Sequence, residues 1–200
     1  AEEAMNSSDP YKALEMMQEE VSRLHVVRNK AQIIDLVKEG AAILKHEYKQ
    51  QVMLGDQYGI PTGWPSLDNM MSGMLPGDII TIIGRPSAGK TYNLLHMANH
   101  AWHHGKTPLV VSMEMKPLPL IQRVTAMEAK IPITHLKQAK LSTKMLPKFK
   151  KGLAMIEANE VPYWIVDGNL TATVPDIMML AKQLKADCVY VDGAYMVESD

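Results

Sequence analysis

Eight consecutive residues have the glycine spacing and side chains of a phosphate-binding loop. Gly84, Arg85, Pro86, Ser87, Ala88, Gly89, Lys90 and Thr91 match the pattern G-x-x-x-x-G-K-[ST] at every defined position. In such loops the backbone N–H groups turn inward and surround phosphate oxygens at the positive end of a helix. We expect Lys90 to reach the β- and γ-phosphates of a nucleoside triphosphate and the Thr91 hydroxyl to bind Mg²⁺.

Three acidic residues follow apolar runs that are typical of buried strands. Glu114 closes one run, and Asp167 and Asp192 each end another in the same Val-Asp-Gly context. Because the carboxyl ends of parallel strands meet at one edge of a sheet, all three carboxylates should lie near the phosphates. We expect Glu114 to polarise the attacking water, while either aspartate could serve the metal ion.

Strand and helix patterns alternate from residue 78 onward, which predicts an α/β fold with a parallel sheet. The expected strands are 78–84, 109–113, 163–166 and 188–191. The β-branched apolar run 78–84 is typical of a fully buried parallel strand. The expected helices are about 90–104, 117–130, 133–158 and 174–185. A helix is thus expected after each of the first three strands, as the connections of a parallel sheet require.

The chain before residue 55 has a different pattern. Two apolar stripes at helical spacing begin at Leu14 and Ile34, and a Gly- and Pro-rich stretch follows them from Gly55. These features predict a helical region over 1–54 that docks on the core or on a neighbouring subunit, and a nucleotide-binding core over 55–200.

Composition excludes several classes of protein. The 200 residues carry a net charge of −1, so overall charge gives no sign of a nucleic-acid partner. The single cysteine, Cys188, excludes an intramolecular disulfide and fits a reducing compartment. No apolar run approaches the ~20 residues of a membrane span, so no membrane partner is expected.

The motifs together resemble the helicase domain of replicative DnaB-type helicases. The resemblance rests on the entry segment 59–78, on the phosphate loop, on the run Ser112-Met113-Glu114-Met115, and on Val191-Asp192-Gly193-Ala194-Tyr195. It covers roughly residues 10–200. It implies a RecA-like core, ATP as the nucleotide, Glu114 as catalytic glutamate and Asp192 as the acid on the Mg²⁺ side, acting through water.

The resemblance also implies a biological role. The family's members hydrolyse ATP to translocate on single-stranded DNA and unwind duplexes as hexameric rings, with a primase and a loader as partners. It therefore implies a cytoplasmic location in a bacterium, or a phage origin. Because the chain stops eight residues after Asp192, we expect it to lack the family's sensor residue, DNA-contacting loops and trans-acting arginine, and to hydrolyse ATP poorly alone.

Two alternatives remain open on the sequence. A RecA-like recombinase or a clock-type ATPase would share the order of strands and acids, and a filament would distinguish the recombinase from a ring. A nucleotide-binding interaction module would bind ATP and never unwind DNA. Two further signals are read as structural: Trp64 and Trp102 as packing residues, and the lysine-rich stretch 137–151 as a solvated helix face.

Overall fold

The computed structural model describes residues 34–55, 58–168 and 173–198, and it divides the chain into two compact units, 1–52 and 53–200. In the first unit a short π-helical turn, η1 (Leu36–Gly40), leads into α3 (Ala41–Leu54). The Asp35 carboxylate caps the start of η1, because it accepts hydrogen bonds from the backbone N–H groups of Val37 and Lys38. The helix predicted to begin near Leu14 lies outside the described residues.

The second unit is built on a parallel sheet of three strands. β1 (Pro108–Ser112) lies between β2 (Trp164–Asp167) and β3 (Cys188–Asp192), in the order β2-β1-β3. Ser112 is in register with Asp167 on one side and with Asp192 on the other. The strands predicted near 109, 163 and 188 are therefore confirmed. Asp167 and Asp192 end β2 and β3 at one edge of the sheet, whereas Glu114 lies two residues beyond the end of β1.

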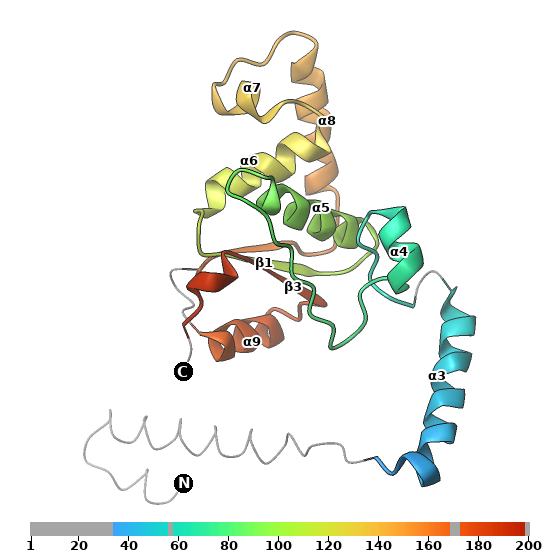
Figure 1. Cartoon of the computed structure of the whole chain (residues 1–200). Helices are drawn as coiled ribbons and strands as arrows, with labels where there is room; N and C mark the ends of the chain where they lie inside the picture. The colour runs from blue at the N-terminus through green and yellow to red at the C-terminus, as the bar shows by residue number, and fades with distance from the viewer. Residues whose placement is uncertain (1–33, 56–57, 169–172, 199–200) are drawn as a thin grey trace, which may run out of the picture. The chain divides into compact units, whose positions relative to one another are not determined.

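Helices cover both faces of the sheet (Figure 1). α5 (Lys90–His103) and α6 (Pro117–Glu128) pack on one face, where Leu95 and Leu120 meet Val110 of the central strand. α9 (Val174–Gln183) packs on the other face, where Ile177 meets Leu109 and Val111. The α/β fold class predicted from the alternating pattern is confirmed.

The segment 133–158, predicted as one helix, forms two. α7 (Ile133–Lys137) and α8 (Met145–Glu157) are separated by a turn in which Ala139 adopts a left-handed conformation with φ 52°. Both helices pack on α6 through a third apolar cluster that includes Ala126, Ile131 and Phe149. The periodicity continues through the turn because Leu141 also contacts this cluster, and so sequence pattern alone missed the break.

The predicted strand 78–84 is wrong as a hydrogen-bonded strand. The segment has no regular secondary structure, it joins no ladder within the described residues, and Ile79 and Ile83 are 92% and 90% exposed. Ile80, which lies between exposed neighbours, packs against the core cluster that contains Leu95 and Val110. A β-branched run supplies the tendency to be extended, whereas a strand also needs a neighbouring backbone to pair with.

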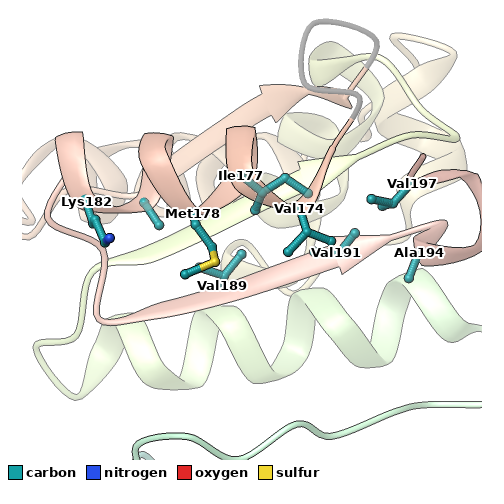
Figure 2. A pocket seen from close by; sticks show the side chains of 9 residues that line it. Val174, Ile177, Met178, Lys182, Val189, Val191, Ala194 and Val197 are labelled. Carbon is teal, nitrogen blue, oxygen red and sulfur yellow. The ribbon is translucent and has the colours of Figure 1, made fainter. Parts of the chain in front are cut away.

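The edge of the sheet at β3 borders an apolar cleft of about 480 Å³ (Figure 2). Val174 and Met178 of α9 lie on one side of the cleft, and Val189 and Val191 of β3 lie on the other. Among the described helices, none is long and apolar enough to cross a membrane.

Two smaller elements complete the unit. α4 (Pro65–Met71) belongs to the entry segment, where Ile60 and Met74 form an antiparallel bridge. The Asp68 carboxylate joins that helix to the buried Thr62, accepting from its backbone N–H and from its hydroxyl, each at 2.7 Å. The short 3₁₀ helix η4 (Ala194–Met196) follows β3.

Candidate functional site

The phosphate loop leads directly into α5. Gly89, with φ 91°, and Ser87, with φ 63°, adopt left-handed conformations that turn the backbone sharply before the helix begins at Lys90. No side chain caps the N-terminus of α5, so its N–H groups remain available to an anion. The loop itself is closed by a hydrogen bond from the Ala88 N–H to the Arg85 carbonyl at 3.1 Å.

The Lys90 side chain folds back over this loop. Its Nζ donates to the Gly84 carbonyl at 3.2 Å, so the ammonium group spans the loop from its last residues to its first. A Cβ added at Gly84 would lie 3.4 Å from the Ala88 Cβ, so a side chain here would crowd the loop. Backbone N–H donors and one ammonium group are a donor set that fits phosphate oxygens.

Thr91, on the first turn of α5, contacts the end of β3. Its hydroxyl donates to the Asp192 carboxylate, with distances of 3.0 Å to Oδ1 and 3.2 Å to Oδ2. Asp192 is buried, and the Ser112 hydroxyl also donates to it, at 3.3 Å. A hydroxyl and a carboxylate are oxygen ligands of the kind that Mg²⁺ prefers, so this pair fits the metal ion expected from the sequence.

The two aspartates that looked alike in sequence occupy different places. Asp192 and Asp167 flank Ser112 from opposite sides, because β1 separates β3 from β2. Asp192 contacts Thr91, whereas Asp167 ends the strand on the far side of β1 from that contact. The register therefore brings Asp192 to the phosphate loop.

Glu114 is exposed and lies just beyond β1, beside the turn that follows Asp192. A Cβ added at Gly193, which has φ 84°, would lie 2.9 Å from the Glu114 Cγ, so glycine is needed for this close approach. The Tyr195 hydroxyl donates to Glu114 Oε1 at 2.8 Å. Donation to a carboxylate raises the pKa of Tyr195, because it stabilises the protonated phenol.

Ser112 connects the two acidic positions. Its hydroxyl donates to Asp192 and accepts from the backbone N–H of Met115 at 3.1 Å. It therefore fixes the turn that carries Glu114 relative to the end of β3. Sequence reasoning gave functional roles to Glu114 and Asp192 but missed the contacts made by Ser112 and Tyr195, although both residues lie within the quoted motifs.

Arg123 of α6 reaches toward the same edge. Its guanidinium lies 5.2 Å from the centre of the Tyr92 ring, and Tyr92 follows Thr91 on α5. One Nη donates to the Met115 sulfur at 2.7 Å, while the buried Nε has no hydrogen-bond partner among the described residues. Arg123 therefore packs between the helix that follows the phosphate loop and the turn that carries Glu114.

The two tryptophans expected to be structural are packed in the fold. Trp102 is buried and donates through Nε1 to the Val161 carbonyl at 2.7 Å. Trp64 packs against the His96 ring, with the ring centres 4.6 Å apart.

Comparison with known proteins agrees with this architecture. The family model described as "DnaB-like helicase C terminal domain" matches residues 59–198. Replicative DNA helicase DnaB of Nostoc sp. is 36% identical over 130 residues, which cover 64% of this chain and 14% of that protein. The DnaB of Geobacillus stearothermophilus is 31% identical over 134 residues, which cover 66% of this chain and 29% of that protein.

Solved structures show the same fold. The ATPase domain of G40P matches with a TM-score of 0.65 and 20% identity, covering 78% of this chain and 56% of that one. A DnaB-like replicative helicase, described with its interactions with primase, matches with a TM-score of 0.65 and 22% identity, covering 88% of this chain and 43% of that one. The chain thus spans under a third of the length of the two curated relatives above.

Proposed function

The chain belongs to the DnaB-like helicase C-terminal domain family, and on that premise we propose that it is part of an ATP-driven replicative DNA helicase motor. In this proposal ATP hydrolysis drives translocation along single-stranded DNA and unwinding of the duplex. The observation that carries the proposal is the contact between Thr91 and Asp192, which joins the phosphate loop to the end of β3. A motor needs this edge to hold the triphosphate and its metal ion together.

Each residue of the site has a role in the proposed reaction. The loop residues Gly84, Arg85, Pro86, Ser87, Ala88 and Gly89 surround the phosphates with backbone N–H groups, and the Lys90 ammonium group neutralises charge on the β- and γ-phosphates. Thr91 and Asp192 are the residues that would hold Mg²⁺, Thr91 through its hydroxyl and Asp192 through water. Bound Mg²⁺ would supply charge neutralisation at the phosphates.

Glu114 is the proposed general base. Its Oε1 accepts from Tyr195, which leaves Oε2 to accept a hydrogen bond from the attacking water. General-base catalysis contributes roughly 10²- to 10⁴-fold to a rate, so this carboxylate would account for a large part of the turnover.

The wider assembly is also a proposal. By family membership we propose a homo-hexameric ring in the bacterial cytoplasm, encoded by the bacterium or by a phage, with the region 1–54 docking on an adjacent subunit. The exposed apolar side chains of Val37, Leu44 and Tyr48 support a docking role for that region. A primase and a helicase loader are the proposed protein partners, and one solved relative is described with its interactions with primase.

Hydrolysis measured with and without single-stranded DNA tests this function. The 200-residue chain alone should bind ATP and hydrolyse it poorly. In the whole protein, DNA should increase ATP hydrolysis, whereas Glu114→Gln should still bind ATP and lose the DNA-stimulated part. Electron micrographs of the nucleotide-bound protein should show rings. Filaments would instead assign a recombinase, and a whole protein that binds ATP with no response to DNA would assign a nucleotide-binding module.

A further inference from the structure

The strongest unexplained feature is a basic surface on α7, α8 and the segments that flank them. Seven lysines and no acidic residue occur between positions 130 and 151, so with a net charge of −1 the remaining residues carry −8. The seven are Lys130, Lys137, Lys140, Lys144, Lys148, Lys150 and Lys151, and all are exposed. We call them the basic surface. Such charge asymmetry within one chain favours a polyanionic partner.

Among the described residues, no carboxylate forms an ion pair with these lysines. The ion pairs found among residues 34–55, 58–168 and 173–198 join Lys38 to Asp35 and His103 to Glu128, and neither involves the basic surface. A solvated helix face usually mixes both signs of charge. A surface of one sign repels itself, and that repulsion is relieved when a polyanion binds.

Packing fixes the direction in which three of the lysines project. Met145 and Phe149 of α8 pack into the cluster on α6, and a Cβ added at Gly152 would lie 2.9 Å from Ala129. Met145, Phe149 and Gly152 are spaced four and three residues apart, and Lys144, Lys148 and Lys151 each come directly before one of them. They therefore form a row about 100° around the helix from the packed side. Because the packed side is buried, the row is held toward solvent.

The same packing decides between two classes of polyanion. A helix that binds a lipid surface inserts its apolar face into the membrane, but the apolar side of α8 is already occupied by α6. Phe149 is part of that cluster, so it is not available to stack on a base. The exposed row therefore offers ammonium groups, which bind phosphates, and no aromatic ring on which a base could stack.

We propose that the basic surface binds the phosphate backbone of single-stranded DNA, independently of base sequence. The choice of DNA as the polyanion rests on the proposed helicase function. The evidence for a polyanion site, which is the charge and packing of the surface, is independent of that function. α6 begins three residues after Glu114 and carries both α7 and α8 on its side away from the strands (Figure 1). A strand held there would contact an element that begins beside the catalytic turn.

The test measures DNA binding without nucleotide, so that it does not depend on ATP hydrolysis. Fluorescence anisotropy of a labelled 30-nucleotide oligo-dT would be recorded between 50 and 200 mM NaCl, on the order of the range over which counterion release is measured. The triple variant Lys144→Gln, Lys148→Gln, Lys151→Gln should bind at least tenfold more weakly at the lowest salt. Its plot of log affinity against log salt should be less steep by about 2, since each phosphate contact on a single strand contributes roughly 0.7.

A matched control carries the same change of charge elsewhere. Lys45→Gln, Lys182→Gln, Lys185→Gln removes three exposed lysines that lie outside the basic surface, and it should keep the wild-type slope. The triple Lys→Arg variant at 144, 148 and 151 should also keep it. Equal losses in the two Gln variants would overturn the proposal, as would binding of vesicles containing phosphatidylserine with no binding of oligo-dT. A loss of ATP hydrolysis with intact, lysine-dependent DNA binding would count against the proposed function alone.

Discussion

The Thr91 hydroxyl donates to the Asp192 carboxylate across 101 positions of the sequence. This contact joins the first turn of α5 to the end of β3, and it sets a hydroxyl and a carboxylate side by side at the proposed metal site. Removing the charge of Asp192 while keeping its shape should therefore weaken Mg²⁺ binding more than it destabilises the fold.

Asp192→Asn is expected to weaken the Mg²⁺-dependent part of ATP binding by roughly 10- to 100-fold, the usual cost of losing an outer-shell metal partner. Binding in the presence of a chelator should change little, because the loop and Lys90 remain. Titration with a fluorescent ATP analogue, with and without Mg²⁺, measures both quantities. Asp167→Asn is the matched control, since it makes the same substitution on the far side of β1. Equal effects of the two variants would contradict the assignment of Asp192.

Tyr195→Phe removes only the hydroxyl that contacts Glu114. If this hydrogen bond positions the catalytic carboxylate, kcat should fall by about threefold to tenfold, the worth of one partly solvated bond to a charged group. KM should stay the same, because the phosphate loop is untouched. A parallel change in kcat and KM would instead indicate a general structural role for Tyr195.

A spectroscopic measurement checks the same contact without turnover. The hydrogen bond to Glu114 raises the pKa of Tyr195, so Glu114→Gln should move the titration of that tyrosine to lower pH. The difference between the ultraviolet titrations of a protein and its Tyr195→Phe variant isolates the signal of this one phenol. An unchanged titration in the Glu114→Gln background would show that the hydroxyl does not contact the carboxylate in solution.

Asp68 predicts an acid-dependent loss of stability. Burial alone would raise the pKa of this carboxyl, but hydrogen bonds from Thr62 and Gly63 outweigh burial and lower it below the ordinary 3.8. Because the pKa is lower in the folded protein, the charged carboxylate stabilises the fold above pH 3.8, and this contribution is lost as the pH falls through the folded value.

The free energy of unfolding in urea should then be lower by about 1 kcal/mol in Asp68→Asn at neutral pH. The difference in unfolding free energy between Asp68→Asn and the wild type should become smaller as the pH falls below 3.8, the ordinary pKa of an aspartate. Asp78→Asn is the control, since within the described residues its exposed carboxylate accepts from the Leu75 N–H alone. A gap that widened with acid would contradict the assigned role of Asp68.

The segment before the phosphate loop predicts a pattern of hydrogen exchange. The amides of residues 79–84 donate no hydrogen bond within the described part of the chain, so they should exchange within seconds, as unprotected amides do. The amides of β1, which is paired on both sides, should be strongly protected. Slow exchange at 79–84 in the nucleotide-free protein would show that this segment is paired in solution.

Sequence reasoning predicted the sheet where strands are central and buried. β1 reads as an unbroken apolar run because both of its faces are covered and both of its edges are paired. The same reasoning failed at 78–84, because an apolar β-branched run does not reveal whether a neighbouring strand is present. It also failed at Ala139, whose left-handed turn carries no glycine signal.

The candidate site was predicted in part for the same physical reason. Strand ends identified Glu114, Asp167 and Asp192, because a parallel sheet gathers them at one edge. The choice of Asp192 needed the register, which sets it and Asp167 on opposite sides of Ser112. The contact between Tyr195 and Glu114 depends on the left-handed turn at Gly193, which spacing alone does not specify.

The claim that residues 84–91 hold a triphosphate is tested most directly by the affinity of the purified chain for ATP with Mg²⁺, measured by calorimetry for the wild type, for Lys90→Ala and for Lys182→Ala. We expect the wild type and Lys182→Ala to bind alike and Lys90→Ala to bind at least tenfold more weakly, a loss of about 1.4 kcal/mol or more. Wild-type protein that binds no ATP, or a Lys90→Ala variant that binds as tightly as wild type, would contradict the claim that residues 84–91 hold a triphosphate.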